Sequence, residues 1–164
     1  MAAVIRIPAQ AMEQYERLRS DPAVTAMEQF IGHGGVSVYE HSLSVTRAAC
    51  RIANLFRMDK DKYVSLVTAG MLHDFYLYDY HGKRTKMGGW HAWRHPAVAL
   101  DNARKLCDIT PRQADAIRNH MFPGTLFHMP HYAEGWAVSL ADKICSICEY
   151  LHIKYYLDAT LVPA

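Results

Sequence analysis

Signals for helix starts constrain the fold of this chain more than any other feature of its sequence. The segment SVYE at 37–40 has the Ser-x-x-Glu form of a capping box, in which each end satisfies a free backbone N–H of the other. It predicts a helix over about residues 38–56. The segment TPRQ at 110–113 repeats the device, with Pro111 at the first helical position, where its missing N–H has no cost. That helix should reach about His120.

Weaker signals complete an all-helical pattern. An amphipathic stretch covers residues 9–20, and a helix should start near Asp61 and run to the end of MLHD at 71–74. Pro96 suggests a start at His95 for a helix through Leu106, and a long last helix should cover about residues 132–156. Glycine and proline mark loops at 32–35, 81–93 and 121–131. Strand signals are weaker throughout, so the predicted fold class is all-α.

Composition limits the class of protein. A chain of 164 residues that is 51% hydrophobic can bury the core of one domain, and a formal net charge of +2 does not indicate a nucleic-acid binder. Arg6 and Pro8 interrupt any secretory signal, and no apolar run reaches the length of about 20 residues that a membrane span needs. With four cysteines and no such signal, we expect a cytoplasmic protein with free thiols.

The chain has 10 histidines, and some of them fall with two aspartates on helix faces that should point inward. His41 lies within the apolar stripe of its helix, three residues after Val38 and four before Val45. The same periodicity directs a further set toward the core, namely His73, Asp74, His120 and Asp142.

These polar residues need a common explanation. An ionised aspartate among apolar neighbours is costly unless it is paired, hydrogen-bonded or metal-bound. A single histidine is more often an ordinary core or surface residue than a ligand. A set of histidines with inward aspartates instead favours one divalent transition metal site, because imidazole and carboxylate together bind iron, manganese, zinc, cobalt or nickel.

The order of these residues resembles the HD-domain superfamily of metal-dependent phosphohydrolases, over about residues 35–150. The strings that carry the resemblance are YEHSLSV around His41, MLHDF around the HD pair and LADKI around Asp142. The resemblance implies a single-domain helical bundle with an N-terminal extension over about residues 1–34. It also implies a first metal held by His41, His73, Asp74 and Asp142.

Two further histidines match the two-metal members of that superfamily. His95 in WRHPAVAL and His120 in IRNHMFP would hold a second metal, with Asp74 bridging the two and His73 and Asp74 as the catalytic pair. Two departures matter. The sequence MFPGT stands where cyclic-di-GMP phosphodiesterases have a GYP element, and Leu77 replaces a lysine that many two-metal members carry.

Basic residues near these positions suit an anionic substrate. The predicted substrate-binding residues are Lys83, Arg84, Lys86, Arg94 and Lys143. A solvated surface turn explains the first four equally well. Aromatic residues at 76–93 could stack on a nucleobase, although ordinary burial explains them too.

The favoured prediction is a hydrolase that cleaves a small phosphorylated substrate, with a nucleotide as one option, by means of a metal-activated water. Two alternatives stay open. HD-domain di-iron oxygenases resemble the chain equally well in their metal residues, so the ligands do not separate hydrolysis from oxygen activation. A non-catalytic metal-binding or sensor module would bind its metal without an open coordination position.

Overall fold

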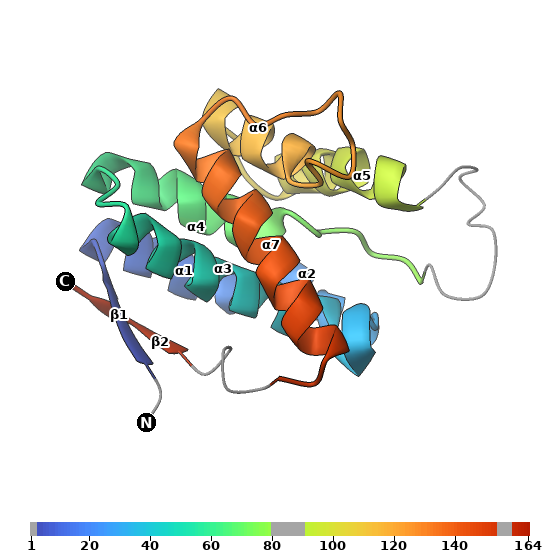
Figure 1. Cartoon of the computed structure of the whole chain (residues 1–164), viewed down its shortest axis with the longest axis horizontal. Coiled ribbons are helices and arrows are strands. Elements are labelled where there is room, and N and C mark those ends of the chain that lie inside the picture. Colours follow the sequence, from blue (N-terminus) through green and yellow to red (C-terminus); the bar gives the residue numbers. More distant parts are fainter. Residues whose placement is uncertain (1–2, 80–90, 154–158) are drawn as a thin grey trace.

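The computed structural model describes residues 3–79, 91–153 and 159–164, and this part of the chain is mostly helical (Figure 1). In chain order the elements are β1 (Ala3–Ile7), α1 (Ala9–Arg19), α2 (Pro22–Thr25), the 3-10 turns η1 (Ala26–Gln29) and η2 (His33–Gly35), α3 (Val38–Leu55), η3 (Lys60–Lys62), α4 (Tyr63–Leu72), α5 (His91–Leu106), α6 (Pro111–Asn119), α7 (Ala133–Tyr150) and β2 (Ala159–Pro163). The predicted all-α class is confirmed. No helix of the described residues is both long and apolar enough to cross a membrane.

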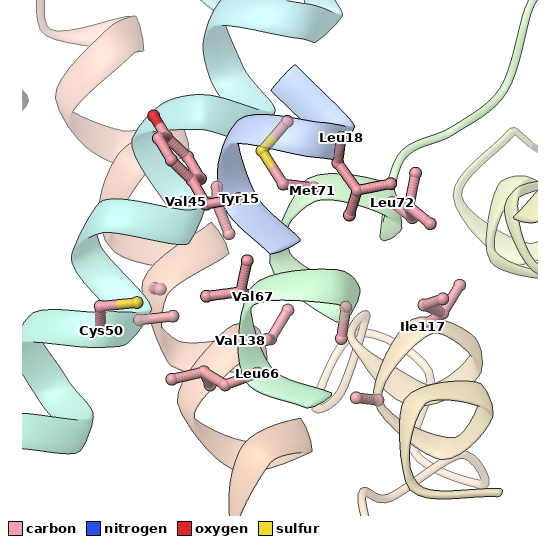
Figure 2. Close-up of a cluster of buried hydrophobic side chains, with 14 of the residues drawn as sticks. Tyr15, Leu18, Val45, Cys50, Leu66, Val67, Met71, Leu72, Ile117 and Val138 are labelled. Atoms are coloured by element: carbon pink, nitrogen blue, oxygen red, sulfur yellow. The ribbon is translucent and has the colours of Figure 1, made fainter. Parts of the chain in front are cut away.

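Helix α4 lies at the centre of the bundle. Its sequence YVSLVTAGML is apolar on almost every side, and it packs against α1, α3, α6 and α7. Figure 2 shows its side chains Leu66 and Met71 among apolar side chains from all four neighbours. Gly70 allows the close approach of α3, since a Cβ at this position would lie 2.8 Å from Thr46 Oγ1. The residues that follow α4 therefore emerge in the middle of the bundle.

Both predicted capping boxes are present. The Ser37 hydroxyl accepts the Glu40 N–H while the Glu40 carboxylate accepts the Ser37 N–H, and Thr110 and Gln113 form the same pair at the start of α6. The helices α3 and α6 begin where the sequence predicts and end within a residue of the predicted ends.

Three predicted boundaries are wrong. Helix α5 already includes residues 91–93, so Pro96 lies inside the helix rather than at its start. A proline inside a helix removes one backbone hydrogen bond, and burial of His95 and Pro96 offsets that loss. Helix α4 ends at Leu72, before the HD pair. Helix α7 ends at Tyr150, because His152 adopts a left-handed conformation with φ of 54°.

The two strands were not predicted. β1 and β2 pair in parallel, from Ala3 opposite Ala159 to Ile7 opposite Pro163, and lie together at one side of the helical bundle (Figure 1). Ile5, Ile7 and Leu161 bury their side chains on the inner face of this pair. The sheet thus joins the N-terminal extension to the last residues of the chain.

Candidate metal centre

Six buried side chains from five parts of the bundle converge at the inner end of α4. They are His41 from α3, His73 and Asp74 directly after α4, His95 from α5, His120 at the end of α6, and Asp142 from α7. Two overlapping groups have ligand atoms close enough to hold a metal ion, and His73 belongs to both: one has His41 and Asp142, the other Asp74 and His120. His95 is in neither group, but its Nε2 lies 3.1 Å from Asp74 Oδ1, so the structure brings together all six residues that the sequence predicts as ligands.

Three of the histidines are oriented by the helix turn that precedes them. The Nδ1 atom of His73 lies 2.9 Å from the Gly70 carbonyl oxygen, and that of His120 lies 2.8 Å from the Ile117 carbonyl oxygen. His95 makes the same contact, at 3.0 Å, with the carbonyl of His91. Because a carbonyl can only accept, each Nδ1 carries a hydrogen, and each Nε2 is the ring nitrogen that faces the site.

His41 stands between two carboxylates, and we call His41, Asp142 and Glu149 the carboxylate half of the site. Its Nε2 lies 3.2 Å from Asp142 Oδ1, and its Nδ1 lies 2.9 Å from a carboxylate oxygen of Glu149. Burial alone would lower the pKa of His41, but the hydrogen bonds to both carboxylates outweigh it and raise the pKa to about 10. Glu149 is fully enclosed and was not predicted, although it lies two helical turns after Asp142 on the same face of α7.

His95 and His120 approach each other directly, and we call this pair the histidine half. Their Nε2 atoms lie 2.9 Å apart. Burial would lower the pKa of His95, but the neighbouring Asp74 carboxylate raises it, so His95 Nε2 carries a proton that faces Asp74 and the lone pair of His120 Nε2. Burial and the neighbouring His73 and His95 lower the pKa of His120 to about 3, so a proton is poorly held there.

Asp74 connects the two halves. Its Oδ1 lies 3.1 Å from His95 Nε2 and 3.5 Å from His120 Nε2, whereas its Oδ2 lies 3.7 Å from His73 Nε2 and 4.0 Å from His41 Nε2. Burial would raise its pKa, but the surrounding histidines hold that pKa well below its usual range. The carboxylate is therefore ionised, with one oxygen directed to each side.

His73 supplies the clearest test of fit for a metal. Its buried Nε2 has no hydrogen-bond partner among the described residues, and the nearest carboxylate oxygens lie 3.7 Å (Asp74) and 3.9 Å (Asp142) away. A buried lone pair without a partner is costly. Imidazole nitrogens and carboxylate oxygens are the donors that zinc and iron-like metals bind at about 2.0–2.2 Å, so these residues fit a divalent metal.

The predicted substrate-binding residues fall in different places. Lys143 reaches the site: its Nζ donates to Asp142 Oδ2 at 3.0 Å and to the His120 carbonyl oxygen. Arg94 is exposed on α5, one residue before His95. Lys83, Arg84 and Lys86 lie outside the described residues.

The aromatic residues considered for base stacking also lie in different places. Tyr76 is buried, and its ring packs edge-on against His95 with centroids 5.8 Å apart, so it belongs to the wall of the site. The Tyr78 hydroxyl lies 3.0 Å from His91 Nδ1, and Trp93 is half-exposed. Tyr80 and Trp90 fall outside the described ranges.

Comparison with known proteins gives one match. The family model described as HD domain matches residues 38–147, which include all six converging side chains. No curated protein and no solved structure shows a significant match to the chain.

Proposed function

Because this chain belongs to the HD domain family, whose members are metal-dependent hydrolases, we propose that it is a phosphohydrolase that cleaves a phosphate ester of a small anionic substrate. The observation that carries the proposal is the position of Asp74. Its two oxygens face two different sets of histidine nitrogens, as a carboxylate between two metals would. Such two-metal sites are typical of phosphoryl transfer.

The ligand assignment follows the two halves. His41, His73, Asp74 and Asp142 would hold one metal, and His95 and His120 would hold a second, with Asp74 serving both. Iron, manganese, zinc, cobalt and nickel all suit this donor set. Metals bound here would supply Lewis acidity for the phosphoryl oxygens and an acidified water as the nucleophile.

The other residues of the site orient these groups and bind the substrate. The carbonyls of residues 70, 91 and 117 fix three imidazole rings, and Glu149 fixes the fourth. Lys143 is a cation at the edge of the site, and its ammonium would bind a phosphoryl oxygen beside Asp142. A fixed cation at this point supports an anionic substrate.

The test compares hydrolysis with oxygen activation. The protein, purified with its native metal, is analysed for metal identity and atoms per chain. It is then assayed for phosphate release from a panel of monoesters, nucleotides included, with manganese, and for oxygen uptake with ferrous iron. We expect about two metals per chain and metal-dependent phosphate release. Oxygen consumption without phosphate release, or tight metal binding with neither activity, would overturn the proposal.

A further inference from the structure

An apolar cavity of about 470 Å³ lies beside the metal centre, between the end of α3, the first half of α7 and the segment that follows His120. Its walls include Ile52, Phe56, Phe122, Trp136 and Leu140. Ligand pockets for small molecules span roughly 300–1,000 Å³ and are mostly apolar with few polar groups. The cavity has the size and the lining of such a pocket.

The apolar side chains of this cavity are unusually open. Phe56 is 73% exposed, Leu140 is 48% exposed and Trp136 is 44% exposed. Contiguous apolar surface of this kind is typical of ligand-binding grooves and of protein–protein or membrane interaction sites. The Phe122 and Trp136 rings stack edge to face at 5.2 Å, which gives the cavity one defined wall.

The polar residues of the lining are Ser139 and Lys143, and Lys143 is the charged one. The Ser139 hydroxyl donates to the Phe122 carbonyl oxygen at 2.7 Å and is therefore occupied. Lys143 also lines the cavity, and its ammonium contacts Asp142 and the His120 carbonyl of the metal centre. The one cation of the lining thus connects the cavity to two residues of the metal centre.

We propose that the cavity binds the apolar part of the substrate, so that the substrate is a phosphate monoester of an aliphatic or aromatic alcohol. This inference rests on the proposed function. The phosphate lies beside Lys143 and the metal ligands, and the alcohol portion lies against Trp136 and Leu140. In the reaction the oxygen of water forms a new bond to phosphorus and the bond from phosphorus to the alcohol oxygen breaks. One proton from the water ends on that oxygen, which gives the free alcohol and inorganic phosphate.

The kinetic test uses a homologous series of n-alkyl phosphates from ethyl to octyl, with the native metal bound. Burial of one methylene is worth about a three- to fourfold gain in affinity, so kcat/KM should rise by about that factor per methylene until the cavity is full. Leu140→Asn should flatten this slope, and Trp136→Ala, one turn earlier on the same helix, is the second variant. Ile147→Asn changes an exposed side chain on the same helix outside the cavity and should keep the wild-type slope.

A binding test separates this proposal from the proposed function. Alkyl phosphonates, whose carbon–phosphorus bond resists hydrolysis, are titrated into the metal-loaded protein by calorimetry. If the affinity for phosphonates rises with chain length in the wild type but not in Leu140→Asn, the cavity proposal is supported. If the same protein hydrolyses no phosphate ester, the proposed phosphohydrolase activity is refuted.

Three results would overturn the cavity proposal. The first is hydrolysis that does not depend on chain length, and the second is a clear preference for nucleotides over octyl phosphate. The third is a flat chain-length series together with a dimer that Leu140→Asn dissociates, since the apolar face would then pair two copies of the chain.

Discussion

The carboxylate half and the histidine half of the metal centre solve the same burial problem in different ways. In the carboxylate half, His41 has a carboxylate at each ring nitrogen, so the group is paired even without a metal. In the histidine half, two imidazoles approach each other across 2.9 Å and share one carboxylate, that of Asp74. The first half has a carboxylate at each nitrogen of its one histidine, whereas the second has one carboxylate for two histidines.

This difference indicates that the two halves contribute differently to folding and to metal binding. A half that is satisfied by its own carboxylates contributes to the folded state before any metal binds. A half in which two histidines share one carboxylate is less completely paired, and a metal bound there would take the place of the proton on His95 Nε2. The halves should therefore respond differently to the same kind of substitution.

Asp74→Asn should have the largest effect, because it removes the one carboxylate that faces both halves. We expect the metal content to fall from about two atoms per chain to none and phosphate release to fall to background, while the helical circular dichroism spectrum is kept. Elemental analysis and a phosphate assay measure this. Asp101→Asn, an exposed position on α5, is the control and should match the wild type. A fully loaded Asp74→Asn protein would show that Asp74 does not connect the two halves.

Replacing one histidine in each half should separate them by stability. In the metal-free protein, His41→Ala leaves Glu149 buried without its partner, and loss of one member of a buried pair costs about 3 kcal/mol or more. His120→Ala removes a neutral imidazole and leaves His95 paired with Asp74, so it should cost clearly less. Urea unfolding of both variants without metal gives the comparison. Equal losses would mean that the histidine half is as well paired as the carboxylate half.

Glu149→Gln should act on one half only. Glu149 orients His41 from behind, and loss of such an outer partner lowers metal affinity by about 10- to 100-fold. Competition with a chelator should release one metal at lower chelator concentration and leave the second unchanged. Glu13→Gln, an exposed glutamate on α1, serves as the control. Equal weakening of both metals would refute the division into halves.

The sequence predicts the candidate metal ligands better than it predicts the residues that orient them. His41 could be found because it interrupts an apolar stripe between Val38 and Val45, and burial follows from that periodicity. Glu149 occupies an equivalent position seven residues after Asp142, but a glutamate near a helix end is ordinarily solvated. What covers this end of α7 comes from far away in the chain: Gly34 approaches so closely that a Cβ there would meet the Glu149 carbonyl.

The elements that the sequence misses depend on distant parts of the chain or on burial. β1 and β2 are five residues each, and each becomes a strand because of a partner more than 150 positions away. No periodicity within either segment records that pairing. The predicted start of α5 is wrong for another reason: Pro96 is typical of a first helical turn, yet the helix already begins at His91, whose ring stacks on His95 and whose carbonyl oxygen lies 3.0 Å from His95 Nδ1.

The capping boxes provide the smallest and most discriminating comparison. Ser37→Ala and Thr110→Ala should each lower the free energy of unfolding by about 1 kcal/mol, because each leaves a backbone N–H of a first turn without its partner. Their effects on metal binding should differ. His41 lies in the first turn of α3, directly behind the Ser37 cap, whereas His120 lies at the opposite end of α6 from Thr110.

Fraying of a first turn should therefore weaken the metal of the carboxylate half in Ser37→Ala and leave both metals unchanged in Thr110→Ala. Urea unfolding and chelator competition measure the two quantities on the same preparations, and the double variant should lose about 2 kcal/mol because the caps share no contacts. If both variants lose equal stability and equal metal affinity, the site responds to the stability of the whole bundle. Metal loss in Ser37→Ala alone would mean that the first turn of α3 positions His41 locally.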